Sequence, residues 1–198
     1  MIRRIYLDLD DVLNTLSMYF LNLLGCNISP VDYREYPVTG NVDLFEVANK
    51  LLGSKYTCET FWKSFERGDW ASVPKTDECD WLIDQCVRLV GRDNVLIATS
   101  PTKDPACAAG KVDWIQANLP EWMHRQYAIT PRKWFFGQPG ALLIDDNQTN
   151  TRLFKKHGGR TLLVPRPWNR LHALWTPLVL VEKLGRLTAR QGDFCEKS

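Results

Sequence analysis

The chain has 198 residues, 44% of them hydrophobic and 24% charged, and a formal net charge of +2. This length suits one ordinary domain or a core with a modest insertion, and the near-neutral charge argues against a nucleic-acid groove or a membrane-binding surface. Because no apolar run reaches about 18 residues and no signal peptide is recognisable, we expect a soluble cytoplasmic protein with no membrane partner.

The first apolar run begins at Ile5 and ends in two aspartates one residue apart, Asp8 and Asp10. In open α/β sheets the reactive groups lie at the carboxyl ends of strands. Two carboxylates at one place raise each other's pKa unless a cation neutralises them, and Mg²⁺ takes carboxylate and phosphate oxygens as ligands. This strand end therefore predicts a site of phosphate chemistry. The alternative is an aspartate-rich turn that only caps the next helix.

Residues 15–76 contain no convincing strand, but they show helical periodicity in three segments that each precede a glycine. The segments are residues 13–24, 44–52 and 58–65. Because this region begins immediately beyond the first strand, we expect it to form a small helical cap that covers the site and excludes water. The alternative is a helical excursion that packs elsewhere.

Six cysteines occur without a C-x-x-C pair, which gives no indication of a zinc site or a thioredoxin-like motif. Cys79 and Cys86 fall on the apolar stripe of a predicted helix that ends at Gly91. We expect them to be buried free thiols.

A second buried strand, beginning at Val95, ends in Thr99-Ser100, whose hydroxyls and neighbouring N–H groups suit a phosphate oxygen. The next helix begins at Asp104-Pro105 and carries Lys111 just beside its apolar stripe, within reach of Thr99. Lys133 follows a short strand candidate at residues 127–130. Read alone, the hydroxyls fit an ordinary turn and each lysine fits a surface charge.

A third apolar run, residues 141–144, ends in Asp145 and Asp146. Capping of the helix that runs to His157 explains one acid at this point but not two. A further strand is expected at residues 161–164, followed by a rigid Pro-Trp-Asn connection at 165–170. The polar last ten residues are expected to be loosely ordered.

The order Asp-x-Asp, Thr-Ser, Lys and Asp-Asp along alternating strands and helices resembles the haloacid dehalogenase (HAD) superfamily of phosphatases. The chain is similar in particular to the 5′(3′)-deoxyribonucleotidases, in which Thr-Ser-Pro is followed by a lysine and then a tryptophan, here Lys111 and Trp114. The resemblance covers residues 1–14 and roughly 77–165. It implies an α/β fold, a Rossmann-like three-layer core with a parallel sheet (residues 1–14 and 77–198), and a helical cap (residues 15–76).

The resemblance also implies roles for the acids. Asp8 corresponds to the nucleophile that forms an aspartyl-phosphate, and Asp10 to the general acid and base, with its backbone carbonyl near Mg²⁺. The predicted metal site comprises Asp8, Asp10, Asp145 and Asp146. Asp146 is expected to bind the metal beside Asp8 while Asp145 orients it, although the sequence leaves open which of the two contacts the ion.

Four further residues are expected to bind the oxygens of the transferred phosphoryl group: Thr99, Ser100, Lys111 and Lys133. Asp11 stands where the family usually has glycine, and an acid there adds strain and negative charge. The cap segment is rich in aromatic residues, and the adjacent rings of Phe61 and Trp62 cannot point the same way on a helix, so we expect one of them to stack on a base.

Together these features predict a Mg²⁺-dependent phosphomonoesterase that hydrolyses nucleoside or deoxynucleoside monophosphates. Its partner is then a small-molecule phosphomonoester. Two alternatives remain open: a phosphatase for the phosphorylated ends of nucleic acids, and a non-catalytic interaction module with the same fold. The sequence does not indicate an oligomeric state.

Overall fold

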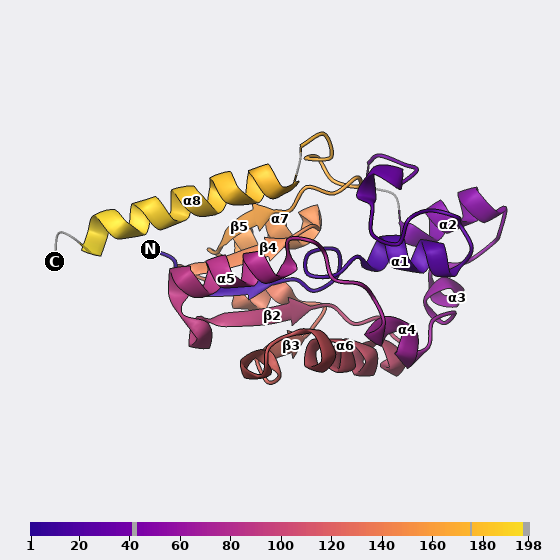
Figure 1. Cartoon of the computed structure of the whole chain (residues 1–198), viewed down its shortest axis with the longest axis horizontal. Coiled ribbons are helices and arrows are strands. Elements are labelled where there is room, and N and C mark those ends of the chain that lie inside the picture. Colours follow the sequence, from indigo (N-terminus) through magenta and orange to yellow (C-terminus); the bar gives the residue numbers. More distant parts are fainter. Residues whose placement is uncertain (41–42, 175, 196–198) are drawn as a thin grey trace.

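The computed structural model describes residues 1–40, 43–174 and 176–195 of the chain. Its centre is a parallel five-stranded sheet in the order β3-β2-β1-β4-β5 (Figure 1). The strands are Arg4–Leu7 (β1), Val95–Thr99 (β2), Tyr127–Ile129 (β3), Ala141–Asp145 (β4) and Arg160–Leu163 (β5). The predicted parallel α/β sheet is confirmed, and each strand lies within one or two residues of its expected place.

Helices cover both faces of the sheet because successive side chains of a strand point to opposite sides. Ile5 and Leu7 of β1 pack into the larger hydrophobic cluster with helices α5 (Cys79–Val90), α6 (Pro105–Asn118) and α8 (Thr176–Cys195). Tyr6, between them, packs on the other face against Phe154 of α7 (Gln148–Lys156). This is the three-layer arrangement predicted from the sequence.

The predicted cap segment (residues 15–76, described except for 41–42) lies beyond the carboxyl ends of the strands (Figure 1). It contains α1 (Leu16–Leu23), α2 (Leu44–Leu52), α3 (Cys58–Trp62), α4 (Arg67–Ala71) and a 3₁₀ turn, η1 (Tyr33–Glu35). The predicted third helix ends at Trp62, and α4 forms separately because Glu66 and Asp69 build a capping box at its start.

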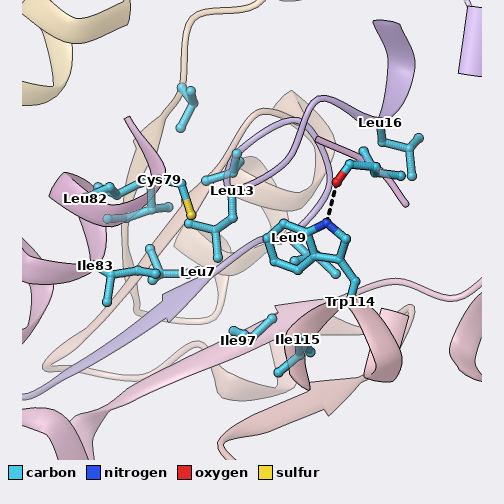
Figure 2. Close-up of a cluster of buried hydrophobic side chains, with 14 of the residues drawn as sticks. Leu7, Leu9, Leu13, Leu16, Cys79, Leu82, Ile83, Ile97, Trp114 and Ile115 are labelled. Carbon is cyan, nitrogen blue, oxygen red and sulfur yellow. Dashed lines mark hydrogen bonds between the residues drawn. The ribbon is translucent and has the colours of Figure 1, made fainter. Parts of the chain in front are cut away.

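The cap segment shares its hydrophobic core with the sheet. Leu9, Leu13 and Leu16 connect the cluster beneath β1 to the cap (Figure 2). Trp114 of α6 is fully buried there, and its indole N–H donates to the carbonyl of Val73 at 2.6 Å. A buried indole N–H requires a partner, so this bond anchors the end of the cap segment to the core.

A long helix follows the Pro-Trp-Asn connection and packs on the core. Helix α8 begins at Thr176-Pro177 and buries Leu180 and Leu184, one helical turn apart, in the large cluster. The helix runs to Cys195. A loosely ordered end over the last ten residues stays a prediction, and residues 196–198 lie outside the described part. Among the described helices, none has both the length and the apolar content needed to cross a lipid bilayer.

Candidate active site at the carboxyl edge of the sheet

Three aspartates from two neighbouring strands meet where β1 and β4 end. Asp8 follows β1, Asp145 is the last residue of β4, and Asp146 follows it. Register pairs Leu7 with Ile144, so the acids reach the same edge of the sheet. Each offers an oxygen, these oxygens lie within 4.8 Å of one another, and all three side chains are buried.

Lys133 neutralises part of this charge. Its Nζ lies 2.5 Å from Asp8 Oδ2 and 2.8 Å from Asp145 Oδ2, and its side chain is 1% exposed. Burial alone would lower the pKa of Lys133, but the attraction of Asp145 and Asp8 is larger than this effect, so the pKa of Lys133 is raised above its ordinary value. The lysine is therefore held as a cation, which leaves three carboxylates facing one ammonium group.

The pKa values of two of these aspartates are raised. Burial raises the pKa of Asp8, aided by Asp145 and Asp10 and opposed by Lys133. Burial also raises the pKa of Asp146 well above its ordinary value, and Asp145, Asp11 and Asp8 add to the rise. A cluster of this kind favours binding of a cation, because a cation removes the repulsion that otherwise favours protonation.

Lys111 holds the second aspartate and the end of β2 together. Its Nζ donates to Thr99 Oγ1 at 2.9 Å and to the Ser100 carbonyl at 2.6 Å, and it forms an ion pair with Asp10. The lysine is 2% exposed, which argues against the alternative reading of Lys111 as an ordinary surface charge. The Ser100 hydroxyl donates to the Thr130 carbonyl at 3.4 Å.

Asp10 has one oxygen engaged and one unpaired. Oδ2 accepts from Lys111, whereas Oδ1 is buried and has no hydrogen-bond partner among the described residues. The side chain is 23% exposed and lines both neighbouring cavities. An unpaired buried carboxylate oxygen is costly, which favours a proton or a further hydrogen-bond partner at this atom.

Asp145 and Asp146 differ in their surroundings. Asp145 is fully buried, and its oxygens accept from Lys133, from the Asn147 N–H at 2.8 Å and from Asn150 Nδ2 at 3.2 Å. Asp146 lines the smaller cavity and accepts from Trp168 Nε1 at 2.6 Å. Asp145 is thus engaged by the protein, while Asp146 faces the open space. Sequence reasoning did not identify Asn150 or Trp168, because each meets its acid only in the folded chain.

Asp11 is the residue at which the sequence predicted backbone strain and added negative charge. Its φ is +57°, in the left-handed region that aspartate enters more readily than most residues. Its buried carboxylate accepts from the Ser17 N–H at 3.0 Å, the Ser17 hydroxyl at 2.6 Å and the Tyr33 hydroxyl at 2.9 Å. The strain foreseen from the sequence is present, and these donors from the cap segment offset it.

Two adjoining cavities open at the site. The smaller, about 330 Å³, is lined by Asp8, Lys133 and Asp146, and the larger, about 670 Å³, by Lys111 and Trp70. Residues from core and cap line both of them: Asp10, Leu16, Trp62 and Ser100. The two spaces therefore meet beside Asp10.

The two candidate stacking residues have different positions. Phe61 is fully buried and lines neither cavity, and its ring centroid lies 5.2 Å from that of Phe65. Trp62 lines both cavities and stacks on Trp70 with ring centroids 5.7 Å apart. Phe61 is thus a cap-core residue, which corrects its inclusion in the substrate pocket. Neighbouring positions on a helix point about 100° apart, which explains the split.

The sequence matches no protein-family model and no curated protein. Solved structures share its fold. A haloacid dehalogenase-like protein of unknown function from Agrobacterium tumefaciens C58 is 12% identical, with 83% of each chain covered and a TM-score of 0.51.

Two further structures have TM-scores below 0.5. A HAD-family hydrolase from Deinococcus radiodurans, with bound phosphate and sodium, is 14% identical over 94% of this chain and 88% of its own, with a TM-score of 0.49. A HAD-family enzyme from Bacteroides thetaiotaomicron, in complex with magnesium and inorganic phosphate, is 13% identical over 88% of this chain and 100% of its own, with a TM-score of 0.43. On the likeness to the Agrobacterium protein, together with the parallel sheet and its helical layers, the chain has the fold of the haloacid dehalogenase superfamily.

Proposed function

We propose that the protein is a Mg²⁺-dependent phosphomonoesterase that hydrolyses nucleoside or deoxynucleoside monophosphates through an aspartyl-phosphate on Asp8. The observation that carries this proposal is the pairing of two strand-end aspartates with two buried lysines beside open cavities. Asp8 is paired with Lys133, and Asp10 with Lys111. Each lysine places an ammonium group beside one of these carboxylates, where a phosphoryl group would meet its nucleophile.

The donor set fits Mg²⁺. Asp8 and Asp146 both line the smaller cavity, all the candidate ligands are oxygens, and the three clustered carboxylates exceed the single charge of Lys133. We assign Asp8, Asp146 and the backbone carbonyl of Asp10 as the groups that would hold the ion. Asp145 then orients the site, because its oxygens are already engaged by Lys133, Asn147 and Asn150. When bound, Mg²⁺ would offset the charge of the carboxylates and of the phosphate oxygens.

Asp8 and Asp10 are oriented for different tasks. The Leu9 N–H donates to Asp8 Oδ1 at 2.7 Å and Lys133 pairs with Oδ2, so the carboxylate cannot rotate freely before it attacks phosphorus. Lys111 holds Asp10 Oδ2, and the Asp10 side chain lines both cavities, where it would protonate the leaving oxygen and later accept a proton from the attacking water. Thr99 fixes Lys111 toward the phosphoryl oxygens.

The larger cavity supports a nucleoside as the leaving group. Its apolar walls are formed by side chains from the cap, from the loop after β2 and from the start of α6, namely Leu16, Trp62, Trp70, Pro101 and Pro105. A flat base stacks well on such an indole face. The rim carries Glu59 and Asp104 as well as Lys63 and Lys103, a balance that does not favour a long polyanion. We therefore prefer mononucleotides to the ends of nucleic acids.

The test is phosphate release from a panel of substrates, with Mg²⁺ or with a chelator. The panel comprises deoxynucleoside 3′- and 5′-monophosphates, ribonucleoside monophosphates, end-phosphorylated oligonucleotides and a small aryl phosphate. We expect hydrolysis of the mononucleotides that needs Mg²⁺ and is absent from Asp8→Asn protein. Faster hydrolysis of the oligonucleotides would overturn the substrate class, and inactivity on every substrate would overturn the enzymatic proposal in favour of an interaction module.

A further inference from the structure

The loop after β5 reaches back to the end of β4 and contacts Asp146 twice. Trp168 Nε1 donates to Asp146 Oδ2 at 2.6 Å, and Asn169 Nδ2 donates to the Asp146 carbonyl at 2.9 Å. The same amide also donates to the Val164 carbonyl at 2.7 Å, and Asn169 is 2% exposed. One short segment therefore holds both the backbone and the side chain of this acid.

The Trp168 ring is itself held by the cap segment. Its centroid lies 4.9 Å from that of Tyr36 and 5.8 Å from that of Tyr33, both in edge-on contact. Tyr33 in turn donates to Asp11 and lies under the guanidinium of Arg166, whose carbon is 4.2 Å from the ring centroid. Arg166 Nε donates to the Asp11 carbonyl at 2.7 Å. The indole is thus fixed from several sides.

An indole N–H is well suited to hold a carboxylate beside a cation. The indole N–H donates one hydrogen bond and accepts none. It therefore cannot bind the metal in place of the carboxylate, and it cannot exchange its role of donor for that of acceptor. It carries no charge and leaves the net charge of the acid cluster unchanged. By fixing Oδ2 of Asp146, it leaves the other oxygen of that carboxylate for a ligand in the smaller cavity that Asp146 and Trp168 both line.

We propose that Trp168 is a positioning residue that aims the Asp146 carboxylate at the metal, with Tyr36 of the cap segment holding its ring. This inference rests on the proposed function, because it needs Mg²⁺ at Asp8 and Asp146. In this role Trp168 acts through the Asp146 carboxylate rather than on the phosphoryl group or the leaving group. Loss of such an outer contact typically weakens metal binding by about 10- to 100-fold.

The test compares Trp168→Phe with Trp122→Phe. Each change removes one indole N–H from a partly buried ring packed against the large cluster, but Trp122 lies beside Arg92, outside both cavities. Calorimetric titration with Mg²⁺ alone is run below the lowest metal-free melting temperature, so that only folded protein is compared. We expect Trp168→Phe to weaken binding about 10- to 100-fold and Trp122→Phe to bind as the wild type does.

Kinetics supply the second readout. In Trp168→Phe the Mg²⁺ concentration for half-maximal hydrolysis should rise by the same factor, while kcat at saturating Mg²⁺ returns close to the wild-type value. Wild-type Mg²⁺ affinity in Trp168→Phe, or equal weakening in both variants, would overturn the inference and leave the proposed function intact. If the wild type neither binds Mg²⁺ nor needs it for hydrolysis, the proposed function fails and this inference fails with it.

Discussion

The edge of the sheet and the cap segment are built on different principles. At the edge, paired charges fix individual atoms: Lys133 bridges Asp8 and Asp145, and Lys111 joins Asp10 to Thr99. In the cap segment, packing between aromatic side chains dominates. Phe20, for example, stacks on Phe65 with ring centroids 3.9 Å apart. Hydrogen bonds to ionised groups set positions closely, whereas apolar packing tolerates exchange as long as volume is kept.

This difference suggests a division of labour. Changes at the sheet edge should reduce the rate on every substrate, because they remove charge or geometry needed by the phosphoryl group itself. Changes on the cavity side of the cap should alter which substrate is bound. Asp11 lies at the boundary between edge and cap, since it follows β1 and accepts hydrogen bonds from Ser17 and Tyr33 of the cap segment.

The largest effect is expected at Asp8. Asp8→Asn should lower turnover of all substrates by about a thousandfold or more, because an amide cannot attack phosphorus. The swap is nearly isosteric and relieves repulsion with Asp145, so the melting temperature without Mg²⁺ should not fall. Phosphate release and circular dichroism measure the two quantities. Substantial activity in the purified variant would remove Asp8 from the mechanism.

The next effect concerns the acid cluster and Mg²⁺. At a Mg²⁺ concentration of about 100 times Kd, binding should add about 2.7 kcal/mol to wild-type stability, or roughly 5–10 °C in Tm. Asp146→Ala should lose most of this shift, whereas Asp113→Ala, a change on the surface of α6, should retain it. Equal shifts in Asp146→Ala and the wild type would show that Asp146 is not a principal ligand.

The cap makes a smaller and selective contribution. Trp62→Ala should raise KM for a nucleoside monophosphate about tenfold, the equivalent of about 1–3 kcal/mol of base stacking, and leave hydrolysis of a small aryl phosphate nearly unchanged. Steady-state kinetics on both substrates provide the comparison. Equal losses on the two would mean that Trp62 only supports the cap fold, and division of labour between edge and cap would lose its main support.

The smallest expected effect is at the boundary. Asp11→Gly relieves about 1–2 kcal/mol of left-handed strain but leaves up to three donors of Ser17 and Tyr33 without their acceptor, at about 1–3 kcal/mol each when buried. The lost hydrogen bonds should outweigh the relieved strain by about 1 kcal/mol or more, which lowers Tm by about 2–4 °C. Thermal unfolding measures this, and a higher Tm in Asp11→Gly would show that strain dominates.

Much of the sheet edge could be predicted from the sequence because its groups follow strands. Each strand end fixes the place of its next residue, so Asp8, Thr99 and Asp145 had to share one edge once the strands were parallel. The reach of Lys111 to Thr99 followed from helix geometry in the same way.

Contacts between distant segments could not be predicted. Trp168 meets Asp146 through a loop that turns back, and Tyr33 meets Asp11 across the cap segment. Periodicity also did not separate α4 from α3, since the capping box of Glu66 and Asp69 interrupts one apolar pattern. Nor did it decide between Phe61 and Trp62, because the direction of the cavity depends on how α3 packs against the core.

The central claim is that Asp8 carries the phosphoryl group during the reaction. Asp10→Asn protein with a small aryl phosphate tests it most directly, because a good leaving group needs little protonation while the later attack of water lacks its base. Intact mass and peptide mapping should then find one phosphoryl group on the peptide that contains Asp8, and none in the Asp8→Asn/Asp10→Asn double variant. Release of the aryl alcohol without a covalent phosphoryl group, or a phosphoryl group on another residue, would contradict the claim.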